Sequence, residues 1–288
     1  MNYRLRNWLA LTAGLAAVTP AWATYRSVTD CPFCETFDNL ATSGTATWQN
    51  DMSGETGWFI QSTGSIGGNG SGLTYKADSG STSTVGIYSY GTGTATDRSV
   101  GAITGGTGAT SVAFGLLLNN NTGSTVHSVG ITYNGEQWRS ASTSAQSLQF
   151  SYAVATGTSG NFYDVDGTGA KGYLSPGVAS GLDTAGDNKG LTWVTASAGN
   201  FTSPNLTGSG AITGTTTGIA FTLNGLNIPS GSSIMLRWVD PSGNTDGLAI
   251  DDVCLSIPVP ETSTYMAGAA VMLMVGGTAL RRRMQKKA

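Results

Sequence analysis

Short blocks of alternating apolar and polar residues, each bounded by Gly or Asn, constrain the fold of this chain more than any other feature. Each block has the length of a β-strand and is rich in β-branched and aromatic residues. Such alternation places one face of a sheet on a core and the other in water. The clearest blocks are 58–60, 85–90, 111–118, 126–133, 147–154 and 219–223. No stretch before residue 265 has a helical period, so the sequence predicts an all-β fold, an antiparallel β-sandwich or jelly roll, over residues 36–256.

Two Asn- and Gly-containing segments follow apolar blocks and are typical of turns. The stretch from Asn119 to Gly123 lies between two such blocks, and Asn134-Gly135 comes directly after Tyr133. Asn and Gly tolerate the positive φ angles that tight turns require. We therefore expect the chain to reverse at both segments.

The first 23 residues have the three parts of a secretory signal peptide in order. Arg4 and Arg6 are followed by the apolar stretch 8–18 and then by Ala21-Trp22-Ala23, an A-x-A cleavage site. Cleavage would leave Thr24 as the first mature residue, with a short Cys-containing segment, 24–35, ahead of the sandwich. An uncleaved N-terminal anchor is the alternative.

The C-terminal segment, 257–288, contains a second apolar stretch. Sixteen largely apolar or small residues, 265–280, precede a basic cluster. A helix of that length spans roughly 24 Å, near the lower limit for crossing a membrane once flanking residues are counted. The basic cluster, Arg281, Arg282 and Arg283, is expected to remain cytoplasmic, which places the preceding chain across the membrane.

The residues before this helix carry a family resemblance. The motif Val259-Pro260-Glu261-x-Ser263-Thr264, followed by a short apolar helix and an Arg cluster, resembles a PEP-CTERM sorting signal. The resemblance implies export, recognition by an exosortase-type membrane protein, removal of the tail, and delivery to the cell surface or its exopolysaccharide. Thr262 stands where family members usually have a second Pro. A plain C-terminal membrane anchor is the alternative.

The charge balance changes when both ends are set aside. Seven of the fourteen basic residues lie in the two terminal segments, whereas all seventeen acidic residues lie between Asp30 and Glu261. Residues 24–261 therefore carry seven basic against seventeen acidic side chains, a net charge of −10. Nucleic-acid binding needs clustered Lys and Arg, so we expect no nucleic-acid partner.

Three cysteines remain for an exported chain: Cys31, Cys34 and Cys254. Export favours a disulfide over a metal site, and zinc would need more ligands than two Cys and one distant His supply. The sequence leaves open whether Cys31 pairs with Cys34 or one of these pairs with Cys254. The long-range pairing would close a loop of over two hundred residues, worth on the order of 4–5 kcal/mol in the entropic description.

The stretch 234–253 reads as strand, turn and strand, with many oxygen ligands. Calcium prefers six to eight such ligands, so this segment is a candidate site for a structural Ca²⁺. Ordinary turn chemistry, with Asp side chains capping backbone amides, is the alternative. No other cofactor is expected. The candidate ligands are Asp240, Asn244, Asp246, Asp251 and Asp252.

Three segments resemble a jelly-roll module of extracellular bacterial proteins. They are Gly135-Glu136-Gln137-Trp138-Arg139, Leu148-Gln149-Phe150-Ser151-Tyr152, and Arg237-Trp238 with Gly247-Leu248-Ala249-Ile250-Asp251-Asp252-Val253. The resemblance implies the fold but leaves the function open, because such modules accompany nucleases, adhesins and other proteins. In a strand, Glu136 and Trp138 point one way and Arg139 the other.

Catalysis has few candidate residues. His127 is the single histidine, and no G-x-S-x-G elbow supports a serine nucleophile. A glycosidase would need two facing acids. Candidates are Glu136, Asp164, Asp166, Asp240, Asp246, Asp251 and Asp252. We therefore expect a non-enzymatic surface or matrix protein that binds exopolysaccharide or other surface components, with an exported polysaccharide hydrolase or lyase using paired carboxylates as the alternative.

Overall fold

The computed structural model describes residues 25–49, 56–62, 66, 68–69, 73–105, 111–155, 180–182 and 188–258. The expected signal peptide with Ala21, Ala23 and Thr24 lies outside these residues, and so does the segment 259–288. No helix within the described ranges has the length and apolar character needed to cross a membrane.

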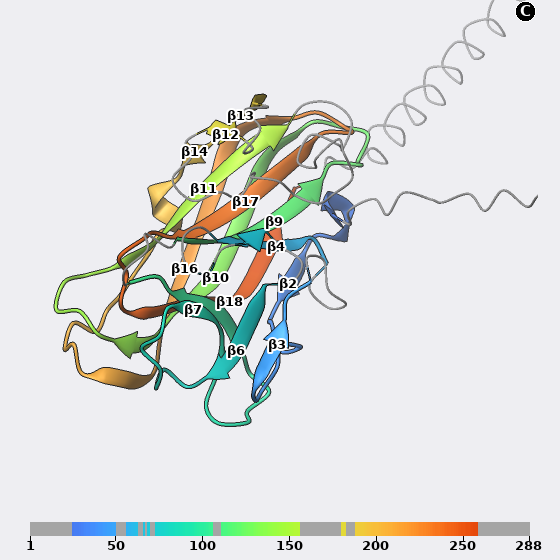
Figure 1. Cartoon of the computed structure of the whole chain (residues 1–288). Coiled ribbons are helices and arrows are strands. Elements are labelled where there is room, and N and C mark those ends of the chain that lie inside the picture. Colours follow the sequence, from blue (N-terminus) through green and yellow to red (C-terminus); the bar gives the residue numbers. More distant parts are fainter. Residues whose placement is uncertain are drawn as a thin grey trace, which may run out of the picture.

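Two eight-stranded sheets form the body of the protein (Figure 1). Sheet A runs β14-β11-β17-β9-β4-β5, with β1 paired to β9 and β15 to β11. Its strands are β1 (Arg26–Ser27), β4 (Trp58–Ser62), β5 (Gly68–Asn69), β9 (Val112–Asn119), β11 (Ser147–Ala155), β14 (Val194–Thr195), β15 (Phe201–Thr202) and β17 (Ser233–Asp240).

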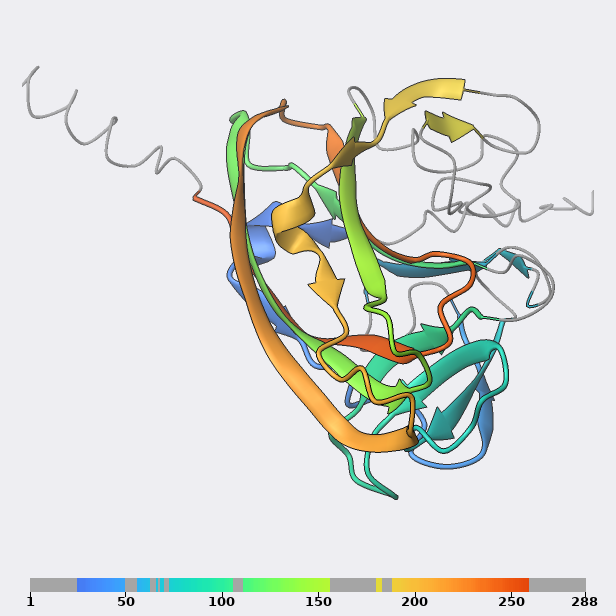
Figure 2. The ribbon, with the colours of Figure 1, turned by 90° about the vertical axis from the view of Figure 1, so that its left-hand side faces the viewer.

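Sheet B runs β16-β10-β18-β8-β7-β6-β3, with β2 paired to β18. Its strands are β2 (Phe33–Glu35), β3 (Thr45–Thr47), β6 (Thr74–Asp78), β7 (Gly86–Tyr90), β8 (Ser99–Ile103), β10 (Val126–Ser140), β16 (Gly210–Ile228) and β18 (Gly247–Ser256). Pairing is antiparallel except for β1 with β9 and β6 with β7. Figure 2 shows β10 and β16 side by side, bending together along the sandwich. The predicted all-β sandwich is therefore confirmed.

The remaining elements are short. Strands β12 (Ser180–Leu182) and β13 (Asn188–Thr192) pair antiparallel in a separate two-stranded sheet. Two single-turn 3₁₀ helices cover Val28–Asp30 and Ser197–Gly199. Ser27 caps the first of them, because its hydroxyl accepts a hydrogen bond from the Thr29 N–H.

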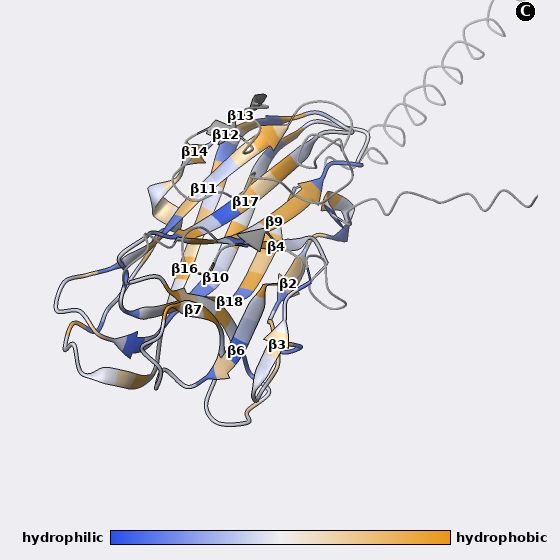
Figure 3. Cartoon of the chain, viewed as in Figure 1, coloured by the Kyte–Doolittle hydropathy of each residue, from blue (hydrophilic) through white to orange (hydrophobic). Residues whose placement is uncertain are grey.

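A single aromatic-rich core fills the space between the sheets. Trp238 on β17 is fully buried, stacks on Trp58 at 5.8 Å between ring centroids, and meets Phe150 and Tyr133 edge-on. Figure 3 shows hydrophobic residues (orange) along β9, β11 and β17. Every position of β9 and β17 is buried, as expected for strands covered on both faces.

The expected turn at Asn134-Gly135 is wrong. Both residues lie inside β10, where they pair with Gly218 and Thr217 of β16. Gly135 is needed here for packing, because a Cβ at this position would collide with the ring of Phe201. The turn expected at 119–123 is present, since Gly123 has a φ of 78° between β9 and β10.

Candidate binding face

The outer face of sheet B carries a strip of small and polar side chains along β10. On this face Gly130, Thr132, Asn134 and Glu136 alternate with the core residues Val129, Ile131 and Tyr133. Register places Thr222, Ala220, Gly218 and Thr216 of β16 beside these four residues in turn. On the other flank, β18 contributes Ser256 beside Gly130 and Cys254 beside Thr132.

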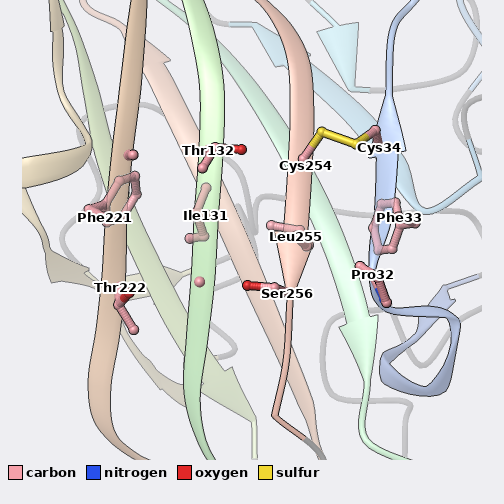
Figure 4. A pocket seen from close by; sticks show the side chains of 12 residues that line it. Pro32, Phe33, Cys34, Ile131, Thr132, Phe221, Thr222, Cys254, Leu255 and Ser256 are labelled. Atoms are coloured by element: carbon pink, nitrogen blue, oxygen red, sulfur yellow. A yellow bond between two sulfur atoms is a disulfide. The ribbon is translucent and has the colours of Figure 1, made fainter.

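Two adjoining open hollows, of about 480 and 560 Å³, lie on this strip and share Cys34, Thr132, Ala220 and Cys254. We call them together the outer groove. Its floor is low because Gly130, Gly218 and Ala220 have little or no side chain there. Figure 4 shows β16, β10, β18 and β2 crossing the groove side by side, with Thr132, Thr222 and Ser256 around it.

A disulfide closes one side of the groove. Cys34 of β2 and Cys254 of β18 are directly opposite each other in the sheet and are bonded, 220 residues apart in the chain. This is one of the long-range pairings that the sequence left open, and it ties β2, the first strand of sheet B along the chain, to β18, the last. Cys31 is free and half-buried, and burial raises the pKa of its thiol to about 11, with Asp30 adding to the rise.

A β-bulge places Asp252 on the groove. Ile250 and Val253 of β18 both point into the core although they are three positions apart, because the pairing with β10 shifts register between Thr132 and Asn134. The bulged residue, Asp252, is exposed and has a φ of 48°. Its Oδ2 accepts a hydrogen bond from the Asn134 side chain at 2.8 Å.

The groove ends at an acidic cluster and a stacked aromatic pair. Glu136 accepts hydrogen bonds from the Trp138 indole at 2.8 Å and from the Thr216 hydroxyl at 3.3 Å. The Trp138 ring lies parallel to that of Tyr90 and is 9% exposed, so it is packed inside the protein and is no open platform for sugar stacking. Glu136 and Trp138 point to the same side of β10, as the strand period predicts.

Asp251 lies beside this end and is 3% exposed. Burial raises the pKa of its carboxyl to about 8, and the nearby charges of Glu136, Asp252 and Asp97 add to the rise. The N–H of Asp252 bonds to its Oδ1 and partly opposes the shift. The carboxyl is therefore largely protonated at neutral pH and can donate a proton.

The five candidate calcium ligands fall into two separate places. Asp251 and Asp252 lie on the outer face, whereas the other three occupy the β17–β18 turn. Asp246 is fully buried, and its carboxylate accepts hydrogen bonds from the N–H groups of Ala141 and Ser142 and from the Gln137 side chain. These contacts cap a neighbouring loop.

Asp240 is also fully buried. Its Oδ1 accepts from the Asn244 amide at 2.6 Å and from Thr104, and burial raises the pKa of its carboxyl well above the ordinary value. The described part of the chain contains no cluster of three or more His, Cys, Asp or Glu residues placed to hold a metal ion.

Among the described residues, the candidate His127 does not line the groove. His127 is an exposed residue at the start of β10 whose ring nitrogen bonds to the Leu226 carbonyl at 2.9 Å. Asp164 and Asp166 lie outside the described residues. The sorting residues Val259, Pro260, Glu261, Ser263, Thr264, Arg281, Arg282 and Arg283 also lie outside them.

Sequence reasoning missed most of the groove. Thr132, Thr222 and Ser256 carry no motif, and the small floor residues look like ordinary strand glycines and alanines. The available signal was the alternation itself, because every second position of 130–136 and of 216–222 is Gly, Ala or polar. Only the register between β10 and β16 shows that these alternating positions lie side by side on one surface.

Comparisons with known proteins give fold-level similarity only. No family model matches the chain, and no curated protein matches it. Among solved structures, the arabinose-bound MgGH51 α-L-arabinofuranosidase is 9% identical with a TM-score of 0.33, covering 79% of this chain and 27% of that one. The tandem CBM22 domains of Paenibacillus barcinonensis Xyn10C are 10% identical with a TM-score of 0.30, covering 78% and 45%.

A xylan-binding domain from CBM 22 is 12% identical, with a TM-score of 0.30, and covers 79% of this chain and 96% of that one. The chain thus spans less than half the length of the arabinofuranosidase and of the tandem domains. These TM-scores are too low to carry a conclusion about this chain.

Proposed function

We propose that the outer groove binds an extended polysaccharide and that the protein is a non-enzymatic component of the cell surface or extracellular matrix. The observation that carries this proposal is the open strip of small and polar residues along β10. Its lining offers hydroxyl, amide and carboxylate groups, which hydrogen-bond to sugar hydroxyls, and none of its lining residues is Lys or Arg. An open groove also suits a polymer better than an enclosed small molecule.

The targeting segments at the two ends of the chain account for its proposed location. The signal peptide directs export, and the Pro260-Glu261 motif with its apolar stretch and Arg cluster serves an exosortase-type sorting step at the membrane. A Cys34–Cys254 disulfide supports an oxidising, extracytoplasmic location.

Blocking the groove tests the binding function. Thr132 is exposed at its centre, so Thr132→Trp is expected to fill both hollows and abolish binding on a glycan array of the full chain in mild detergent. Thr47→Trp, on exposed β3 at the far edge of the same sheet, is the matched control. Wild-type protein that binds no polysaccharide, or binding that survives Thr132→Trp, would refute the proposal.

Replacing Pro260-Glu261 by Ala-Ala tests sorting separately. We expect an unprocessed form to accumulate in the membrane fraction, whereas unchanged processing and localisation would contradict the sorting step.

The nearness of Glu136 to Asp251, whose pKa its charge helps to raise, favours a second candidate, a polysaccharide hydrolase. A protonated carboxyl beside a carboxylate is the combination that glycosidases use as acid and partner. The low exposure of Asp251 argues against it, because a general acid must reach the glycosidic oxygen. Release of reducing ends from bound polysaccharide, lost in both Glu136→Gln and Asp251→Asn, would favour the hydrolase over a passive binder.

A further inference from the structure

Strand β16 ends sheet B with an edge unlike the other sheet edges. The strand orders of sheets A and B end at β14, β5 and β3, which have two, two and three residues, and at β16, which has 19. Within the described residues no strand pairs with the far side of β16. A long edge strand presents a row of free N–H and C=O groups that a second strand can join.

The central part of the β16 edge lacks the protection that most edge strands have. Proteins commonly guard edge strands with charged side chains, proline or bulges that bend the edge away. Residues 210–228 include no charged residue and no proline. The pairing of β16 with β10 shifts register near both ends, between Thr215 and Ala211 and between Asn224 and Ile228. Between these shifts ten successive residues, Thr215 to Asn224, pair one-to-one with β10, so the central part of the edge is regular.

We infer that β16 is a self-association edge, at which two copies of this chain pair antiparallel and merge their two B sheets into one. A second copy fits this edge because identical uncharged strands bring no like charges together. Like charges directly opposite each other would destabilise such a pair. A two-fold axis also gives a closed dimer, whose paired edges are no longer open to a third copy.

The strand period restricts where the axis lies. A two-fold axis perpendicular to the sheet keeps outer faces on the same side, and directly opposite residues in antiparallel strands share a face. An even-numbered residue can therefore lie opposite only an even-numbered residue of the second copy, and an odd-numbered residue only an odd-numbered one. It follows that the axis passes beside one residue, which lies opposite the same residue of the second copy. The middle of the regular stretch 215–224 puts that residue at Ile219 or Ala220.

Lysines on the edge test the inference. Thr215 and Thr217 lie on the side of β16 opposite the outer groove, because Thr216 points to Glu136 on the groove side. With the axis at Ile219, Thr217→Lys would lie opposite Phe221 of the second copy, and with the axis at Ala220 it would lie opposite Leu223. Either arrangement would place an unpaired charge against an apolar side chain. The double variant Thr215→Lys/Thr217→Lys leaves the groove residues in place, so this test is independent of polysaccharide binding.

The measurement is the mass of the full chain in mild detergent by light scattering, with circular dichroism as the check of folding. We expect a dimer for the wild type, at least a tenfold weaker dimer for the double Lys variant, and an unchanged dimer for Thr45→Lys/Thr47→Lys on β3. A monomeric wild type, an open-ended oligomer, or a dimer insensitive to the β16 lysines would overturn the inference.

Cysteine cross-linking gives a second readout that does not depend on detergent. In a Cys31→Ser background, Ile219→Cys or Ala220→Cys, whichever lies on the axis, is expected to form a disulfide-linked dimer on mild oxidation. Thr47→Cys in the same background is the control. Absence of linkage at both axis positions, or equal linkage at Thr47→Cys, would overturn the paired arrangement, and linkage to a different protein would assign the edge to another partner.

Discussion

Removal of the Cys34–Cys254 disulfide is expected to cost a large part of the stability of the sandwich. The bond closes a loop of 220 residues. In the chain-entropy description a loop of this length restricts the unfolded state by about 5 kcal/mol, and native disulfides typically contribute about 2–5 kcal/mol. For a domain of this size, 1 kcal/mol corresponds to about 2–4 °C in Tm. The expected loss in Tm is therefore roughly 4–20 °C.

The variant must avoid mispairing with the third thiol. We therefore compare Cys31→Ser with Cys31→Ser/Cys34→Ser/Cys254→Ser, so that no thiol remains in the second protein. Thermal unfolding of the full chain is followed by circular dichroism, with and without reductant. Cys34 is exposed, so reductant is expected to lower the Tm of the single variant to that of the triple variant and leave the triple variant unchanged.

Equal Tm values for the two variants would refute the reasoning. They would mean that the β2–β18 pairing and the residues packed around it hold without the covalent link, or that the unfolded chain is already compact enough to lose little entropy. A difference that persists in reductant would place the effect in the packing of the serine side chains instead of in loop closure.

Two further predictions concern single residues. Asp251 has a folded-state pKa of about 8 against an ordinary value of 3.8, so the folded chain holds a proton that the unfolded chain releases, and its contribution to stability falls as pH rises from about 4 to about 8. In urea unfolding, Asp251→Asn is therefore expected to have the same free energy of unfolding as the wild type near pH 4 and an increasingly higher one up to pH 8. A constant difference in the free energy of unfolding across that range would contradict the shift. Gly135→Ala places a methyl group against the Phe201 ring and is expected to lower the free energy of unfolding by about 1–3 kcal/mol. In a Phe201→Ala background the ring is absent, so adding Gly135→Ala is expected to cost much less. An equal loss in both backgrounds would show that the two side chains do not collide.

The alternation of apolar and polar residues predicted the fold class correctly because strand period is local. Each of the blocks 58–60, 111–118 and 147–154 falls on a strand, and their inward residues form the core. The same local period placed Glu136 and Trp138 on one face. It failed at Asn134-Gly135, where turn-forming residues lie within a long strand because Phe201, from a distant segment, packs against the glycine.

The candidate site depended on contacts that no local pattern records. Asp251 and Asp252 look like one ligand pair in the sequence, yet a bulge in the pairing with β10 leaves one buried and the other exposed. Asp240 and Asp246 look like cation ligands, and only the folded chain supplies the amide groups that bond to them.

The sequence by itself determined that this chain forms a β-sandwich, because side-chain alternation is a property of each strand alone. Tertiary structure decided which strands are neighbours, and with them the disulfide pairing, the outer groove and the long free edge of β16. Those features depend on the register between segments up to 220 residues apart. That register is set by which side chains the folded chain buries in its core, and a single strand does not contain this information.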